Sequence, residues 1–356
     1  MTQPSAPSAR EKRSNDDYTV GIICALPTEL AAATEMLDTE HPYIVQRGSD
    51  SNSYQFGQIG EHNVVIGALP SGSSGLVSAD RVVSNMSTSF QNIRIGLMVG
   101  IGGGVPSEKH DIRLGDVVVS QPSGEFGGVV QHDIGKIHSR DDFERRRSLN
   151  RPPTTLLTHL TALEALEKRK KLNLTAHLTQ LAEVKQLSDY EFPSGLTDNL
   201  HRPEISHGKG EICSCGPKNF VQRKERRNRH TPVIHFGTIA SGNQVIGNAS
   251  ERDRISKSLG GVLCFEMEAA GLMDNFPCLV IRGISDYSDS HKNDGWHDYA
   301  AATAAAFAKE LLIKLAPATV SITQTINQAM NEVSLQLARN TVDTQHIKQQ
   351  VDRESC

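Results

Sequence analysis

The sequence contains no apolar run long enough to cross a membrane. Its uninterrupted apolar segments fall well short of the roughly 18 residues that a membrane-spanning helix requires. The first 17 residues, MTQPSAPSAREKRSNDD, are polar and lack the apolar stretch of a secretory signal. We therefore expect a disordered leader over residues 1–17 and a cytoplasmic protein.

Cysteine is scarce, with six residues in a chain of 356. The six are scattered and do not form the spacing of a disulfide framework. Cys24, Cys264 and Cys278 lie inside apolar segments, where a free thiol behaves as a small hydrophobic side chain. We therefore do not expect disulfides to hold the fold together.

The sequence also lacks a recognised metal-binding motif. Cys213 and Cys215 form a C-x-C pair, but no second pair follows at zinc-finger spacing. Asp289, His291 and His297 lie close together in sequence without an H-E-x-x-H or comparable ligand set. We therefore expect no metal site.

An excess of positive charge is absent, because the formal net charge is −4. This balance gives no general attraction to nucleic acid. Basic clusters do occur at 144–147, 167–171 and 223–230, the last reading RKERRNRH. Such clusters can contact phosphates, but a solvated loop or helix face explains them more simply.

Hydrophobic residues make up 37% of the chain, enough for a globular protein with a sizeable core. Short runs rich in β-branched residues alternate with helical patterns, which predicts a single α/β domain with a mixed, largely parallel sheet flanked by helices. The candidate strands cover 18–26, 63–69, 93–100, 115–120, 232–240, 262–265 and 277–285. The candidate helices cover 28–37, 76–90 and 296–315.

Three segments differ from this pattern. Residues 141–230 contain charged, leucine-containing helical segments and then loops rich in Gly, Pro and His, and we interpret them as a variable insertion. The main domain is expected over 18–316, and Pro317 marks the end of its last helix. Residues 317–356 form a polar tail that is predicted to be helical or disordered.

The glycine run VGIGGGV at 99–105 is not a dinucleotide-binding fingerprint, because Val105 occupies the position of the last glycine and a strand rather than a long helix follows. Glycine has no side chain, so backbone N–H groups at Gly102 and Gly103 can lie close to a ligand. A tight turn explains the run equally well.

Three acidic residues, Glu29, Glu268 and Asp286, lie at or just after the carboxyl ends of expected strands. Ligands of open α/β sheets bind at this edge. Each residue taken singly also fits a helix N-terminus, where a carboxylate caps the helix or complements its dipole. Together they indicate a site in which carboxylates bind hydroxyl groups and transfer protons.

Five motifs together resemble a known family. They are GIICALPTEL, VGIGGGV, TIASGN, FEMEAAG and VIRGISDYSD, and their order and spacing are similar to those of the purine nucleoside phosphorylase and uridine phosphorylase superfamily. The nearest branch is that of the methylthioadenosine/adenosylhomocysteine nucleosidases. The longer strings resemble the fungal type, which also occurs as the N-terminal domain of NLR-like proteins. The resemblance covers roughly 18–140 and 231–315.

The resemblance implies a role for each matching residue. Asp286 matches the general acid that protonates purine N7, and Glu29 matches the residue that activates the attacking water. Glu268 matches the ligand of the ribose 2′ and 3′ hydroxyls, so the strand is expected to end here. The other expected ribose contacts are Met267, Glu266, Gly102 and Gly103. The expected base-pocket residues are Ser241, Val245, Ile246 and Ser285. Ser285 is also expected to orient Asp286. Glu266 either shares the hydroxyls or holds the junction.

The resemblance implies a purine nucleosidase that releases the free base and ribose from adenosine or a related nucleoside. Hydrolysis is favoured over phosphorolysis, because Met98 and Ile101 replace the Arg and Ser of the purine phosphorylase pattern and Glu29 replaces an Arg that binds phosphate. Ile101 also differs from the nucleosidase pattern, which has Ser. The family needs no cofactor.

The substrate and the assembly stay open at this stage. The base is a 6-amino or a 6-oxo purine, and the 5′ group is a hydroxyl, a methylthio group or phosphates. We expect water as co-substrate, a homodimer or larger homo-oligomer, and neither nucleic acid nor membrane as partner. The alternatives are a phosphorylase, an ATP-type nucleosidase, and a nucleotide sensor module of an NLR-like defence system.

Overall fold

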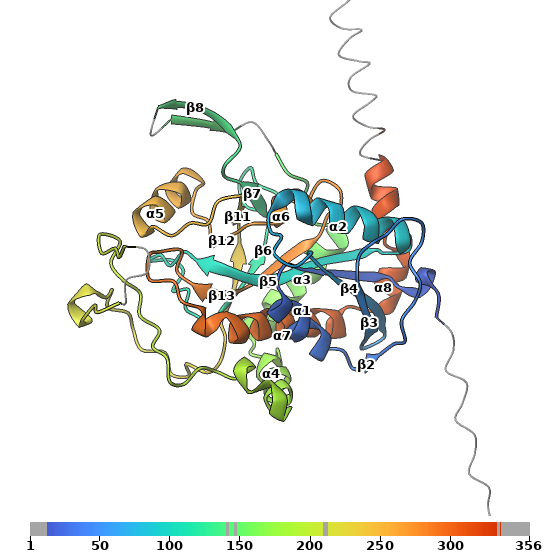
Figure 1. The fold of residues 1–356 in the computed structure, drawn as a ribbon, viewed down its shortest axis with the longest axis horizontal. Coiled ribbons are helices and arrows are strands. Elements are labelled where there is room, and N and C mark those ends of the chain that lie inside the picture. The colour runs from blue at the N-terminus through green and yellow to red at the C-terminus, as the bar shows by residue number, and fades with distance from the viewer. Residues whose placement is uncertain (1–12, 140–141, 146–147, 209–212, 333–334, 336–356) are drawn as a thin grey trace, which may run out of the picture.

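A mixed sheet of eleven strands runs through the protein in the computed structural model, which describes residues 13–139, 142–145, 148–208, 213–332 and 335 (Figure 1). The strands are β1 (Val20–Cys24), β2 (Thr39–Glu40), β3 (Tyr54–Ile59), β4 (His62–Ala68), β5 (Ile95–Gly104), β6 (Val117–Ser120), β7 (Val129–Gln131), β10 (Ile234–Gly237), β11 (Ile239–Ser241), β12 (Cys264–Glu266) and β13 (Leu279–Asp286). The main path is β10-β6-β13-β5-β1-β4-β3-β2, and β12, β11 and β7 continue from β5. A separate hairpin, β8 (Gly135–Ser139) with β9 (Asp142–Arg145), projects from the body (Figure 1).

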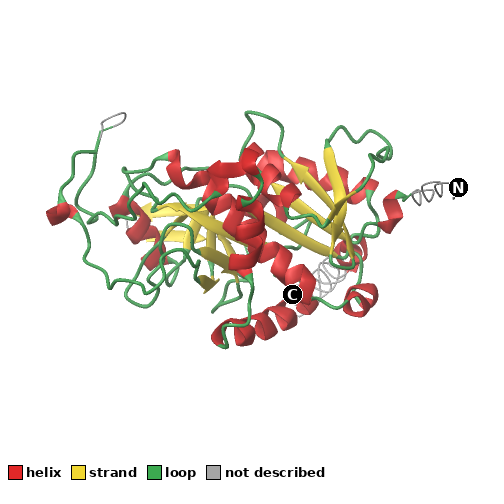
Figure 2. Cartoon of the chain, turned by 90° about the horizontal axis from the view of Figure 1, so that it is seen from below, coloured by secondary structure: helices red, strands yellow, loops and turns green. Residues whose placement is uncertain are grey.

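Helices cover both faces of this sheet (Figure 2). They are α1 (Pro27–Glu35), α2 (Leu76–Ser89), α3 (Thr154–Lys168), α4 (Leu174–Ala182), α5 (Ala249–Ser258), α6 (Ala269–Leu272), α7 (His297–Lys314) and α8 (Pro317–Ile322). Short 3₁₀ turns cover Asn15–Asp17, Lys185–Tyr190, Pro217–Asn219 and Asp294–Trp296. The predicted single α/β domain with a largely parallel sheet is confirmed.

The central strands β4, β1, β5 and β13 are parallel and buried on both faces, which explains their nearly continuous apolar sequences. Alternate side chains enter two different cores. In β13, Leu279 and Ile281 belong to the core shared with α1, α3 and α7, whereas Val280 and Ile284 belong to the core shared with α2 and α6. The sheet is thus held from both sides, and its strand ends are rigid supports for a site.

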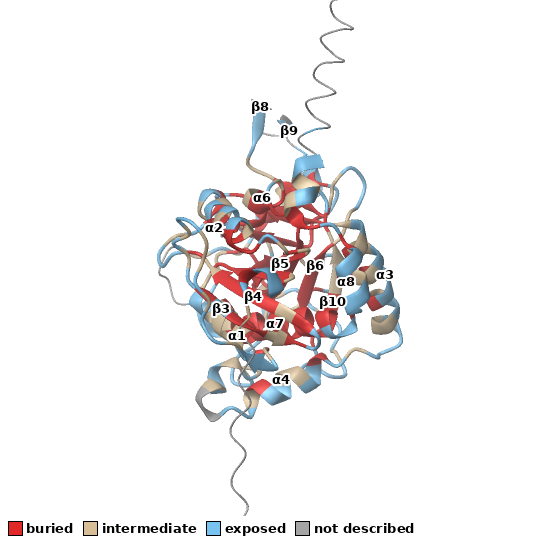
Figure 3. Ribbon diagram, turned by 90° about the vertical axis from the view of Figure 1, so that its right-hand side faces the viewer, coloured by how far each residue is buried: buried red, intermediate tan, exposed pale blue. Residues whose placement is uncertain are grey.

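Helix α7 crosses the sheet with most of its length buried (Figure 3). The backbone of α7 lies very close to β13, since a Cβ at Gly283 would overlap the carbonyl oxygen of Ala300. The small alanine side chains of α7 permit this close approach. None of the helices in the described part of the chain combines the length and the apolar character needed to cross a membrane.

The predicted strands and helices are present, with three differences. The strand expected over 232–240 is interrupted at Thr238, and its halves pair with different neighbours: β10 with β6, and β11 with β12 and β7. The glycine run 99–105 mostly continues β5 to Gly104 rather than forming a turn. Pro317 follows α7 but also begins α8, because its fixed φ suits the first position of a helix.

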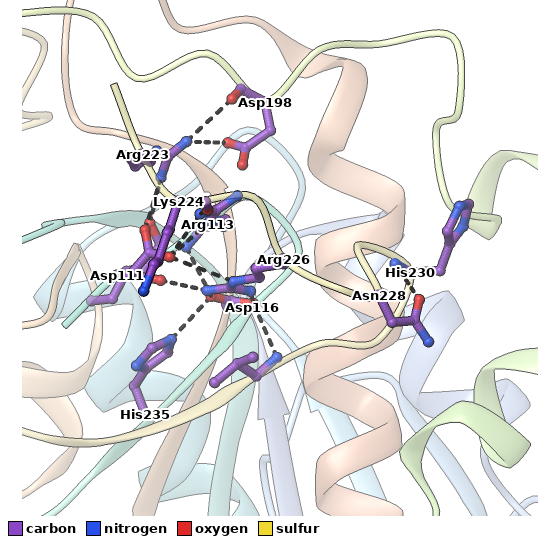
Figure 4. Close-up of polar contacts among 12 residues, drawn as sticks. Asp111, Arg113, Asp116, Asp198, Arg223, Lys224, Arg226, Asn228, His230 and His235 are labelled. Atoms are coloured by element: carbon purple, nitrogen blue, oxygen red, sulfur yellow. Dashed lines mark hydrogen bonds and ion pairs between the residues drawn. The ribbon is translucent and has the colours of Figure 1, made fainter. Parts of the chain in front are cut away.

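The insertion packs on the domain rather than standing apart. Leu156, Leu160 and Leu163 of α3 are almost completely buried in the same core as α7. Part of the basic run 223–230 is also anchored, because Arg226 forms two ion-pair hydrogen bonds of 2.6 and 2.7 Å with buried Asp116 (Figure 4). A solvated basic loop is therefore the wrong interpretation for Arg226.

Arg223 is engaged in the same region. Its guanidinium donates to Asp198 at 3.0 Å (Figure 4) and to the Tyr287 hydroxyl at 2.9 Å, and Tyr287 also bonds to Asp198. Since Tyr287 follows directly after β13, these contacts tie the insertion to the end of that strand. Residues 1–12 of the expected leader and most of the tail lie outside the described residues.

Candidate active site

A cavity of about 300 Å³ lies at the carboxyl ends of β1, β5 and β13. Among its lining residues are ten of those predicted from the sequence: Glu29, Gly102, Gly103, Val245, Ile246, Glu266, Met267, Glu268, Ser285 and Asp286. Ser241 is the predicted residue that does not line it. A larger hollow of about 870 Å³ around Lys109, Glu125 and Leu263 contains none of the predicted residues.

Strand register brings the separate motifs together. Gly103 of β5 pairs with Phe265 of antiparallel β12 on one side and with Asp286 of parallel β13 on the other. The register of β13 shifts between Ile284 and Asp286, and such an irregularity redirects the side chains that follow it. Three motifs that are far apart in sequence therefore meet at one position of the sheet.

Glu29 is held in the first turn of α1. Its carboxylate accepts hydrogen bonds from the backbone N–H groups of Ala25 at 2.6 Å, Leu26 at 2.9 Å and Ile101 at 2.7 Å. The side chain is 2% exposed but borders the cavity. These three donors stabilise a buried carboxylate and fix its position.

Glu268 lies at the junction between β12 and α6. The strand ends at Glu266, as expected, and Glu268 leaves the extended conformation with φ −121° and ψ −37°. Its carboxylate accepts from the backbone N–H groups of Gly75 at 3.2 Å and Met267 at 3.3 Å. Burial raises the pKa of Glu268 to about 7; the charge of Arg282 opposes this shift, and that of Glu266 adds to it.

The neighbouring Glu266 has different contacts. Its carboxylate forms an ion pair with Arg282 and accepts from the backbone N–H groups of Glu268 at 3.1 Å and Ala269 at 2.9 Å. Of its two expected roles, these bonds fit the one that holds the strand-to-helix junction. Glu266 also borders the cavity, beside Glu268.

Arg282 is a fully buried cation beneath the site, and the sequence motifs did not single it out. Besides its bond with Glu266, its guanidinium lies 3.7 Å from a carboxylate oxygen of Glu268 and 3.9 Å from one of Glu29. Burial by itself lowers the pKa of Arg282, but the three carboxylates outweigh this effect and raise the pKa. An arginine inside the apolar strand sequence LVIRGIS was the signal that could have identified it.

Asp286 borders another part of the cavity. Its carboxylate accepts from the backbone N–H of Ser288 at 2.7 Å and from the Ser285 hydroxyl at 3.2 Å. The ammonium group of Lys292, which was also not predicted, lies 3.3 Å away. Nothing in its sequence context distinguished Lys292 from an ordinary surface lysine.

Two glycines of β5 make room for these groups. A Cβ at Gly100 would overlap the carboxylate of Glu29 and the guanidinium of Arg282, and one at Gly103 would overlap the Ser288 hydroxyl and the carboxylate of Asp286. Gly100 and Gly103 are therefore required by polar and charged side chains that pack against the strand. Gly103 also borders the cavity, so this requirement adds to the ligand approach suggested by the sequence.

The predicted base-pocket residues do not share one environment. Val245 is 62% exposed and Ile246 is 8% exposed, and both border the cavity together with Phe265. Ser241 is fully buried, and its hydroxyl accepts from the backbone N–H of Ala270 at 2.9 Å. With this bond, Ser241 holds the start of α6 rather than lining the cavity.

The arrangement defines a class of site: carboxylates at the carboxyl edge of a largely parallel α/β sheet, set around a cavity that suits a small polar ligand. The match to the Phosphorylase superfamily over residues 19–316 then shows that the chain belongs to that family. The family predicted from the five motifs is thereby confirmed.

The chain is similar to two proteins that are longer than the part it matches. An NLR-like protein of Hyaloscypha variabilis is 46% identical over 89% of this chain and 31% of its own length. An ATP nucleosidase of Escherichia coli is 26% identical over 82% of this chain and 50% of its own length. The chain therefore spans about a third of the first relative and half of the second.

One solved structure shows the fold. The methylthioadenosine/adenosylhomocysteine nucleosidase of S. pneumoniae, solved with a transition-state inhibitor, superposes with a TM-score of 0.52 at 19% identity. The match covers 84% of this chain and 100% of the other. At this identity the likeness establishes the fold alone.

Proposed function

We propose that this protein hydrolyses the N-glycosidic bond of adenosine or a related purine nucleoside and releases the free base and ribose. The observation that carries the proposal is the convergence of Glu29, Glu268 and Asp286 on one cavity. The family and the nucleosidase relative support N-glycosidic hydrolysis as the class of reaction.

The three carboxylates have complementary roles in this proposal. Cleavage of the bond develops positive charge on the sugar ring and negative charge on the leaving base, much as in glycoside hydrolysis. Asp286 donates a proton to purine N7, which removes the charge of the leaving group. Glu268 accepts hydrogen bonds from the ribose hydroxyls, and Glu29 accepts a proton from the attacking water.

The electrostatics of the cavity favour hydrolysis over phosphorolysis. The carboxylate of Glu29 repels a phosphate dianion at the nucleophile position, whereas it can activate water. The buried Arg282 is paired with Glu266 and lies near two further carboxylates, so its charge is already compensated.

A nucleotide substrate is the second candidate. Lys292 and His297 both border the cavity, and the side chain of Lys292 is 36% exposed. The ammonium group is paired with Asp286 at 3.3 Å, but it is partly exposed and can therefore also contact a phosphate of the substrate. The E. coli relative, which is described as an ATP nucleosidase, supports this candidate independently.

The test is product analysis with purified protein. Adenosine, inosine, methylthioadenosine, AMP and ATP are each incubated with and without phosphate, and the products are separated by chromatography. We expect free base with ribose, or with a ribose phosphate from a nucleotide, and no need for inorganic phosphate. Ribose 1-phosphate formed only with phosphate would identify a phosphorylase, and no base release from any substrate would support a sensor module.

Two variants test the assigned roles. Asp286→Asn and Glu29→Gln are each expected to lower kcat by at least about 10²-fold, the lower range for loss of a positioned acid or base. Glu35→Gln is the matched control, because Glu35 is exposed at the other end of α1. A kcat close to that of the wild type in either test variant would disprove the corresponding role.

A further inference from the structure

Two cysteines and two histidines from distant parts of the chain meet beside the proposed active site. His201, Cys213, Cys215 and His291 are called the Cys–His cluster below. One potential ligand atom from each residue lies within 4.8 Å of all the others. Three of these residues belong to the insertion, whereas His291 lies in the loop after β13, next to Lys292.

The distances within the cluster are close to those of a tetrahedral zinc site. The Sγ of Cys213 lies 3.7 Å from Nε2 of His201, and the Sγ of Cys215 lies 3.8 Å from Nε2 of His291. Zinc bonds of about 2.3 Å to sulfur and about 2.0 Å to nitrogen, at tetrahedral angles, separate such atoms by about 3.5 Å. The cluster therefore needs only a small adjustment to share one ion.

The surroundings of His291 supply a further feature of metal sites. Its Nδ1 lies 3.6 Å from Oδ2 of Asp289, and neither buried atom forms a hydrogen bond with the described residues. A histidine that ligates a metal through one ring nitrogen usually directs the other toward a carboxylate or carbonyl. Asp289 is therefore in position to orient His291 when Nε2 binds a cation.

The rings of His201 and His291 are stacked, with centroids 3.4 Å apart and planes inclined by 2°. Binding of one ion by both Nε2 atoms requires the rings to tilt toward it by side-chain rotation.

We propose that the Cys–His cluster binds one zinc ion, which joins the insertion to the loop that follows the proposed catalytic acid. Two sulfur and two nitrogen ligands favour zinc over cations that prefer oxygen. The sequence alone predicted no metal site, because the four ligands come together only in the folded chain. A second cavity of about 300 Å³ is bordered both by members of the cluster and by Asp286.

The ion would complete an anchor that the protein side chains have already begun. The insertion contacts the same loop through Arg223 and Asp198 at Tyr287, and through the backbone N–H of His207, which donates to Ser290 at 3.0 Å. A metal bond to His291 adds a stronger link between these segments. We therefore expect the metal to order the loop that carries Lys292.

The first experiment measures the metal directly. The full chain is purified under reducing conditions without a chelator, and its metal content is determined by mass spectrometry. We expect about one zinc per chain, and less than about a tenth of that in Cys215→Ser and in His291→Ala. His138→Ala is the matched control, because His138 is exposed on the separate β8–β9 hairpin.

The second experiment remains informative if a ligand variant folds poorly. Metal is removed from the wild-type protein with a chelator, and the metal-free protein is titrated with Co²⁺. The thiolate charge-transfer and visible bands of a tetrahedral sulfur-ligated site are expected to appear, and to disappear when Zn²⁺ displaces the Co²⁺. Asp289→Asn is expected to weaken zinc affinity by about 10-fold to 100-fold, measured by competition with a chromophoric chelator.

Hydrogen exchange tests the proposed anchoring. Removal of zinc is expected to increase exchange in 197–208, 213–221 and 287–293, with little change in β1 and β4. The proposal is overturned if the reduced protein contains no zinc and binds no Co²⁺. The Nε2 of His207 lies 3.2 Å from the Sγ of Cys215, so His207 is an alternative ligand. The proposal is also overturned if His207→Ala abolishes zinc binding while His201→Ala does not.

Discussion

Arg282 compensates three carboxylates that are otherwise costly to bury together. Its guanidinium is 0% exposed and lies close to Glu29, Glu266 and Glu268. Close like charges raise the pKa of a carboxyl group, and the arginine limits this effect. At the scale of single residues, the site is thus a balance between one cation and three potential anions.

Glu268 gives the stability a specific pH dependence. In the unfolded chain it loses its proton at about pH 4.3, whereas burial raises its pKa in the folded protein to about 7. The folded state therefore binds more protons between these values, so the free energy of unfolding falls as the pH rises through this window. Glu268→Gln is expected to remove this fall and to be more stable than wild type at pH 8 by about 1–3 kcal/mol.

The comparison of the two proteins by chemical unfolding at pH 5, 6, 7 and 8 tests this prediction. Glu35→Gln serves again as the control, because it changes an exposed carboxylate. An unchanged slope of stability against pH in Glu268→Gln would show that Glu268 does not carry the dependence.

At the scale of elements, β13, which ends at Asp286, lies in close contact with α7. Gly283 has no space for a Cβ against the backbone of Ala300. Gly283→Ala is expected to lower the free energy of unfolding by about 1–3 kcal/mol, because either the helix or the strand must move. Gly195→Ala is the control, since a Cβ at Gly195 meets no atom within 4 Å. Thermal unfolding distinguishes the two variants, and equal losses in both would contradict the tight contact.

A second contact between elements joins the basic run to the start of β6 through Asp116. Burial alone raises the pKa of Asp116, but hydrogen bonds from Arg226 and His235 lower it overall. The buried carboxylate is thus stabilised in its charged form. This pair explains why Arg226 is fixed against the sheet, although most of the run around it is exposed.

At the scale of the whole molecule, the insertion and the sheet share one core. Helix α3 contributes buried leucines to the core that also contains α7. Unfolding is therefore expected to be a single transition, with coincident curves from far-UV circular dichroism and from the fluorescence of buried Trp296, the single tryptophan. An early fluorescence transition would instead indicate that the region around Trp296 unfolds separately.

The sequence predicted the central sheet well, because β1, β4, β5 and β13 are buried on both faces and have the apolar runs that this requires. It missed β3, whose sequence YQFGQI contains an exposed glutamine and a glycine, a residue that is depleted in strands. It also predicted one strand over 232–240, because the interruption at Thr238 depends on partners in β6, β7 and β12.

The sequence by itself determined the family, the alternation of strands and helices, and the acidic residues at strand ends, because local composition and short motifs carry this information. Only the tertiary structure showed that Arg282 lies beneath three carboxylates and that Glu266 holds the junction. It also brought Cys213 and Cys215 to His291, which no sequence spacing indicates. Such contacts depend on the packing of segments far apart in the chain, and a single sequence does not encode their distances in any local pattern.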